Sequence, residues 1–131
     1  MRLAEVDIVE PLRIGVLGAA RINAWAIATP AHLTGHRLVA IAARDPLRAR
    51  SFADEHQVER VLDSYEEVIA DPEVDVIYNP LPNGLHGAWN LRAIAAGKAV
   101  LCEKPSASNG EQARQVRDAA RAAGIPFMEA F

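Results

Sequence analysis

Short, nearly continuous apolar runs alternate with longer amphipathic segments along this chain of 131 residues. Runs of this kind are typical of strands that are buried on both faces of a parallel sheet. The runs predict five strands, at Leu12–Leu17, Arg37–Ala43, Asp75–Asn79, Ala99–Cys102 and Pro126–Phe131.

Between these runs the hydrophobic period changes to that of a helix. One segment has an apolar face formed by Ala49, Phe52, Ala53 and His56. Its opposite, polar face carries Arg48, Arg50, Asp54 and Glu55. Asp45 precedes this segment as a candidate N-cap, and Pro46 occupies the first helical position that proline favours.

Further helix boundaries are marked by capping residues and by glycine. Ser64 and Glu67 have the spacing of a capping box, and Ser108 and Glu111 have the same spacing. Gly97 and Gly124 each follow a helical segment, as C-terminal glycines do. Alternation of strands with helices predicts an α/β fold with a doubly wound, mostly parallel sheet of the Rossmann type.

Composition and charge exclude several classes of protein. The chain is 50% hydrophobic, which is too apolar for a disordered protein, and its net charge is −3 with acidic and basic residues intermixed. No basic face is visible, so we expect no nucleic-acid partner. No apolar run approaches the roughly 18 residues of a membrane helix, so no membrane partner is expected.

Cysteine and histidine usage narrows the chemistry further. Cys102 is the single cysteine, so the chain forms no intrachain disulfide. Acidic residues interrupt the first eleven positions, which is wrong for a signal peptide, and we expect a cytoplasmic protein. The histidines have no ligand spacing with cysteine or paired carboxylates, so no metal site is predicted. They are His32, His36, His56 and His86.

In an open parallel sheet, ligands bind outside the carboxyl ends of the strands. The first predicted strand is followed by Gly18, which can make a tight turn, and by amides that would open a helix and favour a pyrophosphate. The glycine pattern is degenerate, because Ala20 and Asn23 stand where a dinucleotide fingerprint has smaller residues. An ordinary strand-to-helix turn is the alternative interpretation.

The second predicted strand is followed by Arg44 and Asp45. A guanidinium at this point can pair with a 2′-phosphate and stack on adenine, which favours NADP(H) over NAD(H). Asp45 is better explained as the cap of the next helix. The alternative for Arg44 is a solvated surface arginine.

The third and fourth strands lead into two proline-containing segments. In the first, Asn83 is a candidate cap of the following helix, and His86 lies in the first turn of that helix as either a site residue or a structural one. In the second, Glu103 and Lys104 precede Pro105, a context that permits a cis peptide bond. Lys104 could hydrogen-bond a substrate hydroxyl and exchange protons with it. The alternative is a surface ion pair between Glu103 and Lys104.

Taken together, four motifs of the chain resemble the Gfo/Idh/MocA family of oxidoreductases. The motifs are Ile14–Ile22, Ala43–Pro46, Tyr78–His86 and Leu101–Pro105. The resemblance covers residues 12–131 and is closest to the branch with xylose dehydrogenases and dihydrodiol dehydrogenases. In that branch an Ala-Ala-Arg version of the glycine turn is familiar, whereas Asn23 is a departure from the family pattern.

The resemblance implies a Rossmann domain that holds NADP, with NAD as a possible substitute, and hydride transfer to or from a small hydroxy or carbonyl substrate such as a sugar or polyol. It implies that Lys104 is catalytic and contacts the reacting oxygen. It also implies cofactor contacts by residues of the four motifs. Those residues are Gly18, Ala20, Arg21 and Ile22 at the pyrophosphate, Arg44 at the 2′-phosphate, Leu81, Asn83 and His86 beside the nicotinamide, and Glu103 near its ribose.

The predicted organisation is an N-terminal extension over residues 1–11 and a Rossmann domain over residues 12–131. Family members continue into a second α/β domain that holds most of the substrate pocket and usually the oligomer interface. We therefore expect either a fragment of a longer enzyme or a short natural form, inactive alone, with a homo-oligomer possible for the full-length form. A non-enzymatic dinucleotide-binding module and an inert remnant are the alternatives.

Overall fold

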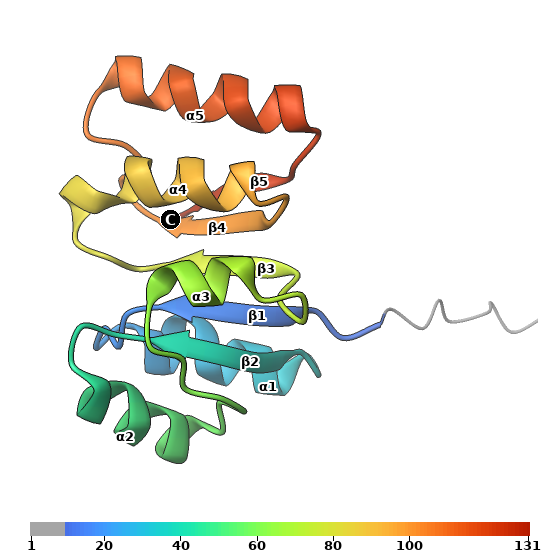
Figure 1. The fold of residues 1–131 in the computed structure, drawn as a ribbon, viewed down its shortest axis with the longest axis vertical. Coiled ribbons are helices and arrows are strands. Elements are labelled where there is room, and N and C mark those ends of the chain that lie inside the picture. The colour runs from blue at the N-terminus through green and yellow to red at the C-terminus, as the bar shows by residue number, and fades with distance from the viewer. Residues whose placement is uncertain (1–9) are drawn as a thin grey trace, which may run out of the picture.

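Five parallel strands form one sheet in residues 10–131, the part of the chain that the computed structural model describes (Figure 1). The sheet order is β2-β1-β3-β4-β5. The strands are β1 (Arg13–Leu17), β2 (Arg37–Ala42), β3 (Val76–Asn79), β4 (Ala99–Glu103) and β5 (Phe127–Ala130). The predicted strands and the α/β class are thus confirmed, while most of the predicted N-terminal extension lies outside the described residues.

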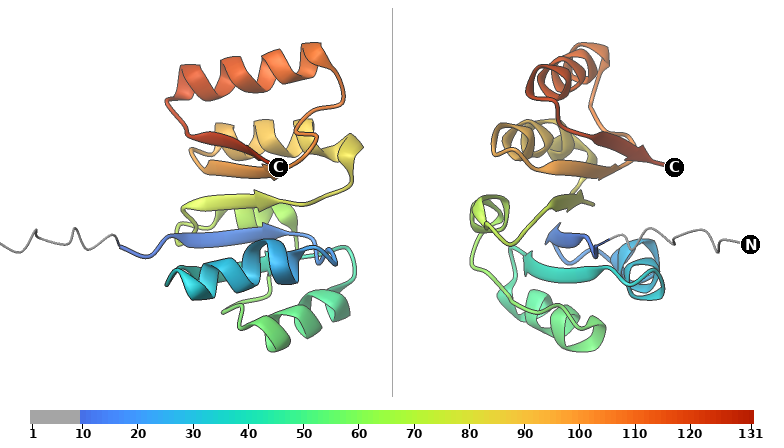
Figure 2. Two further views of the ribbon diagram at one scale, coloured as in Figure 1. Left: turned by 180° about the vertical axis from the view of Figure 1, so that it is seen from behind. Right: turned by 90° about the vertical axis from the view of Figure 1, so that its right-hand side faces the viewer.

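Helices cover both faces of the sheet (Figure 2). One face is covered by η1 (Ala24–Ala28), α1 (Thr29–Leu33) and α2 (Pro46–His56). The other is covered by α3 (Tyr65–Ala70), α4 (His86–Ala95) and α5 (Gly110–Ala123), with a 3-10 turn, η2 (Asn83–Leu85), before α4. None of the helices in residues 10–131 has the length and apolar character needed to cross a membrane.

The order in which the chain adds strands to the sheet reverses at β1. β1 lies between β2 and β3, so the chain builds outward from β1 on both sides. On the outer side of β2, Ile41 forms a single parallel bridge with Val61, and this one residue pair is not extended into a strand. The point of reversal, between β1 and β3, is where open α/β sheets bind ligands.

Side-chain caps begin α2, α3 and α5. The Asp45 carboxylate accepts a hydrogen bond from the Leu47 amide at 3.0 Å, and Ser64 Oγ accepts one from the Glu67 amide at 3.1 Å, as predicted. The prediction for the last helix was wrong by one position. Asn109, and not Ser108, is the N-cap, because its Oδ1 accepts from the Gln112 amide at 2.9 Å.

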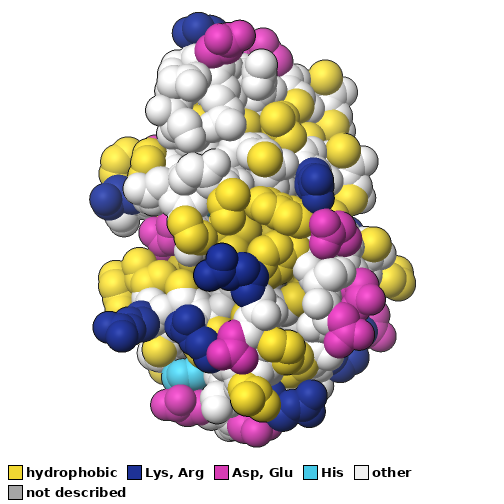
Figure 3. Space-filling view, turned by 60° about the vertical axis from the view of Figure 1, so that its left-hand side comes forward, with side chains coloured by type: hydrophobic (Ala, Val, Ile, Leu, Met, Phe, Trp, Pro, Cys, Tyr) yellow, Lys and Arg dark blue, Asp and Glu magenta, His cyan; other side chains and the backbone are white. Residues whose placement is uncertain are grey.

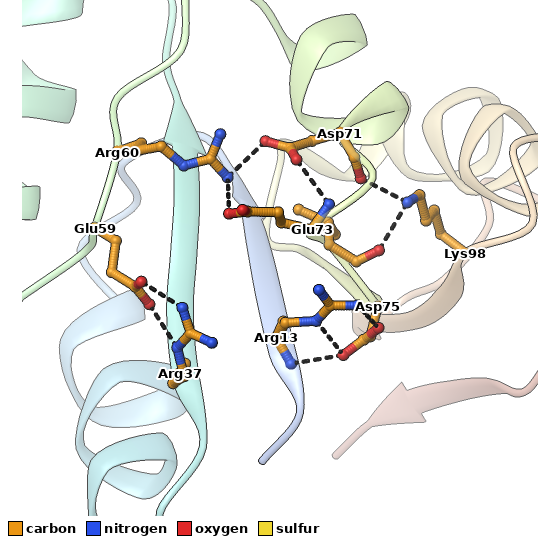
Figure 4. Close-up of polar contacts among 9 residues, drawn as sticks. Arg13, Arg37, Glu59, Arg60, Asp71, Glu73, Asp75 and Lys98 are labelled. Atoms are coloured by element: carbon orange, nitrogen blue, oxygen red, sulfur yellow. Dashed lines mark hydrogen bonds and ion pairs between the residues drawn. The ribbon is translucent and has the colours of Figure 1, made fainter. Parts of the chain in front are cut away.

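At the amino ends of the strands, charged residues pair with one another (Figure 4). Lys98 Nζ donates to the carbonyl oxygens of Asp71 and Val74, each at 2.7 Å. Ion pairs join Arg13 to Asp75, Arg37 to Glu59, and Arg60 to Asp71. Ion pairs and side-chain hydrogen bonds therefore hold this end of the sheet together.

Candidate functional site

A cleft of about 630 Å³ lies at the carboxyl ends of β1, β2 and β3. On this side of the molecule, hydrophobic side chains gather in the middle and Lys or Arg side chains lie beside them (Figure 3). Five residues predicted for the site line the cleft: Gly18, Ala20, Arg44, Leu81 and Asn83. The structure thus brings together residues from the ends of three strands that are separated along the chain.

Gly18 makes the turn that leaves β1. Its φ of +86° belongs to the left-handed region, which glycine adopts readily, and its amide donates to the Ala42 carbonyl at 2.6 Å. A Cβ atom on Gly18 would lie 3.1 Å from Leu81 Cδ2, which is closer than an ordinary van der Waals contact. The turn therefore needs glycine both for its backbone conformation and for its close approach to Leu81.

The turn after Gly18 presents backbone donors. The amides of Ala19, Ala20, Arg21 and Ile22 form no hydrogen bond with any residue of the described range. Successive amides without internal partners form a concavity that suits an anion. The sequence predicted that a helix opens directly after Gly18, and this was wrong. The helix begins only at Ala24, as the π-helical segment η1.

Asn23 stabilises this turn. Its side chain is fully buried, and its Nδ2 donates to the Gly18 carbonyl at 2.9 Å. Its backbone amide donates to the Ala20 carbonyl at 3.1 Å. The side-chain bond to the Gly18 carbonyl gives the buried amide group of Asn23 a partner within the turn itself.

Two arginines border the cleft at the end of β2. Arg44 is exposed and has no ion-pair or hydrogen-bond partner within residues 10–131. Arg48 also lines the cleft, and its Nη2 donates to the Ala19 carbonyl at 2.9 Å. Sequence reasoning missed Arg48, which it assigned to a polar helix face; the available signal was its position in the first turn of α2, four residues after Arg44.

The loop after β3 forms another wall of the cleft. Asn79 Oδ1 accepts a hydrogen bond from the Leu81 amide at 3.2 Å, which shapes the start of the loop. The prediction that Asn83 caps the next helix was wrong. The 3-10 turn η2 begins at Asn83, so this residue lies too early to cap α4, and neither helix start has a side-chain cap bond.

The residues after β4 lie at the same edge of the sheet. Tyr78 Oη donates to Glu103 Oε1 at 2.7 Å, and no ion pair joins Glu103 to Lys104 within the described part of the chain. The surface ion pair weighed from the sequence is therefore not present. Burial, followed by the hydrogen bond to Glu103, raises the pKa of Tyr78 above its ordinary value. The Lys104–Pro105 peptide bond is cis, and the Lys104 side chain is exposed.

Other predicted site residues lie outside the lining of this cleft. Arg21 borders an adjacent hollow of about 450 Å³, and Ile22 is half-buried. His86 is 1% exposed, so it presents almost no surface to a ligand. Glu103 ends β4, the strand next to β3, and Lys104 follows it; neither residue lines the cleft. No cluster of three or more potential metal ligands occurs in residues 10–131.

The parallel sheet, the glycine turn and the cleft beside the first strand define a nucleotide-binding domain of the Rossmann class. The chain matches the family described as "Oxidoreductase family, NAD-binding Rossmann fold" (GFO_IDH_MocA) over residues 12–131. The protein belongs to the Gfo/Idh/MocA family, and the resemblance proposed from the four motifs is confirmed.

Named relatives agree with this assignment. The chain is 39% identical to D-xylose 1-dehydrogenase (NADP(+)) 2 of Haloferax volcanii over 92% of its own length and 37% of that protein. It is 38% identical to human trans-1,2-dihydrobenzene-1,2-diol dehydrogenase, over 92% of the chain and 36% of that enzyme. The branch predicted from the sequence is therefore confirmed, and the chain spans little more than a third of these relatives.

Solved structures share the fold. KijD10, a 3-ketoreductase from Actinomadura kijaniata crystallised with TDP-benzene and NADP, superposes with a TM-score of 0.84 at 39% identity. The match covers 93% of this chain and 39% of that one. Myo-inositol 2-dehydrogenase from Lactobacillus plantarum gives a TM-score of 0.79 at 25% identity, over 92% of this chain and 36% of that enzyme.

Proposed function

We propose that this chain binds NADP(H) in preference to NAD(H) and forms the cofactor half of an oxidoreductase. The observation that carries the proposal is one cleft lined by two arginines and by Ala19 and Ala20, whose amides have no hydrogen-bond partner within residues 10–131. Amides at a strand-to-helix turn suit a pyrophosphate, and guanidinium groups suit a phosphate monoester. Gly18 has no Cβ atom, and this leaves room beside Leu81 for a dinucleotide to approach the backbone.

Each part of the site has a proposed role. The amides of Ala19 to Ile22 hold the pyrophosphate, and Arg44 pairs with the 2′-phosphate. Arg48, which is anchored to the Ala19 carbonyl, provides a second cation at the same end of the cleft. Leu81 and Asn83, which line the cleft, are proposed to lie beside the nicotinamide. Glu103, held by Tyr78, is proposed to lie near the nicotinamide ribose.

Lys104 is proposed as the catalytic residue. Bound NADP supplies hydride transfer to or from a carbon atom. The Lys104 ammonium donates a hydrogen bond to the oxygen on that carbon and stabilises negative charge that develops there. Its exposure and the absence of an ion-pair partner within residues 10–131 leave its donors available for this bond.

The substrate is proposed to be a sugar, a polyol or a similar small hydroxy or carbonyl compound. The relatives named for xylose, dihydrobenzene diol and inositol act on vicinal hydroxyl compounds, as their names indicate, which supports this class. Because these relatives are dehydrogenases, they do not favour a non-enzymatic regulatory module. The chain spans little more than a third of the two named dehydrogenases, so this substrate class is proposed for the protein that carries the domain.

The test is a calorimetric titration of the folded chain with NADPH and with NADH. Arg44→Ala should weaken NADPH binding by about tenfold, which corresponds to a lost charge-assisted hydrogen bond of about 1.4 kcal/mol, and should change NADH binding by less than about twofold. Arg50→Ala is the matched control, because Arg50 lies on α2 but not on the cleft. Equal losses for both cofactors would contradict the 2′-phosphate role, and no binding by the folded wild-type chain would contradict the proposal.

A further inference from the structure

A buried polar network lies directly behind the segment that carries Lys104. It consists of side chains from β3 and α4, and Asn79, His86 and Asn90 are each at most 1% exposed. Asn79 Nδ2 donates to Asn90 Oδ1 at 2.8 Å and to the His86 carbonyl at 3.3 Å. Buried polar groups are costly unless they are hydrogen-bonded, so a network of this kind requires an explanation.

The network ends on the backbone of two consecutive residues, Pro105 and Ser106. His86 Nδ1 lies 2.6 Å from the Pro105 carbonyl oxygen, and Asn90 Nδ2 donates to the Ser106 carbonyl oxygen at 3.0 Å. From the opposite side, Glu129 Oε2 on β5 accepts a hydrogen bond from the Ser106 amide at 2.6 Å. Three side chains from two elements therefore fix the backbone that immediately follows Lys104.

The contact of His86 defines its tautomer. A carbonyl oxygen only accepts, so the hydrogen of the 2.6 Å contact is on Nδ1 of His86. The other ring nitrogen, Nε2, is buried and has no partner among the described residues. A histidine retained for packing alone would not need this one strong contact, whereas a histidine that orients the Pro105 carbonyl does.

We propose that His86, Asn90 and Glu129 are positioning residues that hold the Pro105–Ser106 backbone and thereby aim Lys104 at the bound cofactor and substrate. They act through the segment and touch neither ligand. For His86 this replaces the direct nicotinamide contact that the family resemblance implied, because the side chain is buried. The proposal rests on the proposed role of Lys104, and the arms of the experiment separate the two.

The variants follow from the donor and acceptor at each contact. In His86→Asn the amide nitrogen takes the place of Nδ1 and keeps a donor toward Pro105, whereas His86→Leu keeps bulk but has no donor. Asn90→Asp keeps the shape but replaces the donor toward Ser106 with a second acceptor. Matched controls are His32→Leu, at an exposed histidine, and Asn109→Asp, at an N-cap where aspartate serves equally well.

The experiment is nuclear magnetic resonance on the labelled chain, with NADPH affinity measured in parallel. The ring nitrogens of His86 should show the Nδ1–H form, and NADPH should shift the Lys104 signals. His86→Leu and Asn90→Asp should speed exchange of the Ser106 amide by at least about tenfold, while NADPH affinity stays within about twofold. Both variants should lose most of the Lys104 response, and His86→Asn should restore it.

Unchanged Ser106 exchange and an unchanged Lys104 response in these variants would overturn the proposal, and so would an Nε2–H form of His86. If His86→Leu does not fold, the proposal is decided by the His86 tautomer of the wild-type chain and by Ser106 exchange in Asn90→Asp. If the folded wild-type chain binds no NADPH, the proposed function fails. The Ser106 exchange rates still decide whether His86 and Asn90 hold the segment, so the two failures are distinguishable.

Discussion

Tyr78 and Glu103 are joined across β3 and β4 by a hydrogen bond of 2.7 Å from the phenol to the carboxylate. This is the one side-chain hydrogen bond that Glu103 forms within residues 10–131, so removal of the buried Tyr78 hydroxyl leaves the carboxylate without it. Tyr78→Phe should lower the free energy of unfolding by about 1.5 kcal/mol, as expected for a hydrogen bond to a charged acceptor. Urea denaturation measures this change. Tyr65→Phe is the control, because Tyr65 Oη forms no side-chain hydrogen bond within residues 10–131, and an equal loss there would contradict the argument.

Lys104→Ala should separate cofactor binding from catalysis. In a protein that carries this domain together with its substrate site, turnover should fall at least about a hundredfold, because a donor to the developing oxyanion is removed. NADPH affinity of the isolated domain should change less than about twofold. Steady-state kinetics and calorimetry measure the two effects. Turnover within a few-fold of wild type would show that Lys104 is structural.

Gly15 on β1 has no room for a side chain. A Cβ atom there would lie 2.7 Å from Val68 Cγ1 and 3.0 Å from Val74 Cγ1, because α3 and its following loop pack closely on β1. Gly15→Ala should therefore destabilise the fold by about 1–3 kcal/mol through overpacking, measured by thermal or urea unfolding. Gly110→Ala, where the nearest atom is the flexible Arg114 Nη1 at 3.4 Å, should not destabilise it. Comparable losses in both variants would refute the packing explanation.

Asp71 should make stability depend on acid pH. Burial raises its pKa, but the Glu73 amide and the Arg60 ion pair outweigh burial, so the net pKa lies below the ordinary value. The folded state thus favours the carboxylate, and its contribution is complete above about pH 4 and is lost as pH falls further through the depressed pKa.

The corresponding variant is Asp71→Asn. At pH 7 it should reduce the free energy of unfolding by about 2 kcal/mol, and its difference from wild type should shrink as pH falls below about 4. Asp54→Asn, at an exposed position on α2, should show no such dependence. A constant difference for Asp71→Asn across this pH range would exclude the linkage.

Cys102 should be unreactive in the folded protein. It is fully buried on β4, and burial raises the pKa of its thiol to about 11, so the thiolate is scarce at pH 8. A chromogenic disulfide reagent should modify it only at the rate of unfolding, and immediately in concentrated urea. A cysteine introduced at exposed Ser51 should react at once. Rapid modification of native Cys102 would show that β4 opens readily.

Several features were predictable because they depend on local physics. Apolar runs located all five strands within one residue at each end, since strands buried on both faces leave no polar alternation to obscure them. Asp45 as a cap and Gly18 as the residue that makes the turn after β1 follow from the conformational preferences of single residues. The family resemblance likewise depended on motifs that are contiguous in the sequence.

Other features were decided by tertiary structure. Arg48 lies on a polar helix face in the sequence, and only the packing of α2 beside the Gly18 turn brings it to the Ala19 carbonyl. His86 is an isolated histidine in the sequence, and its role depends on the Pro105 carbonyl, 19 residues away. Hydrophobic and turn preferences act over a few residues and so determined the elements and their order. The partners of buried polar groups depend on which strands and helices become neighbours, so only the assembled fold determined them.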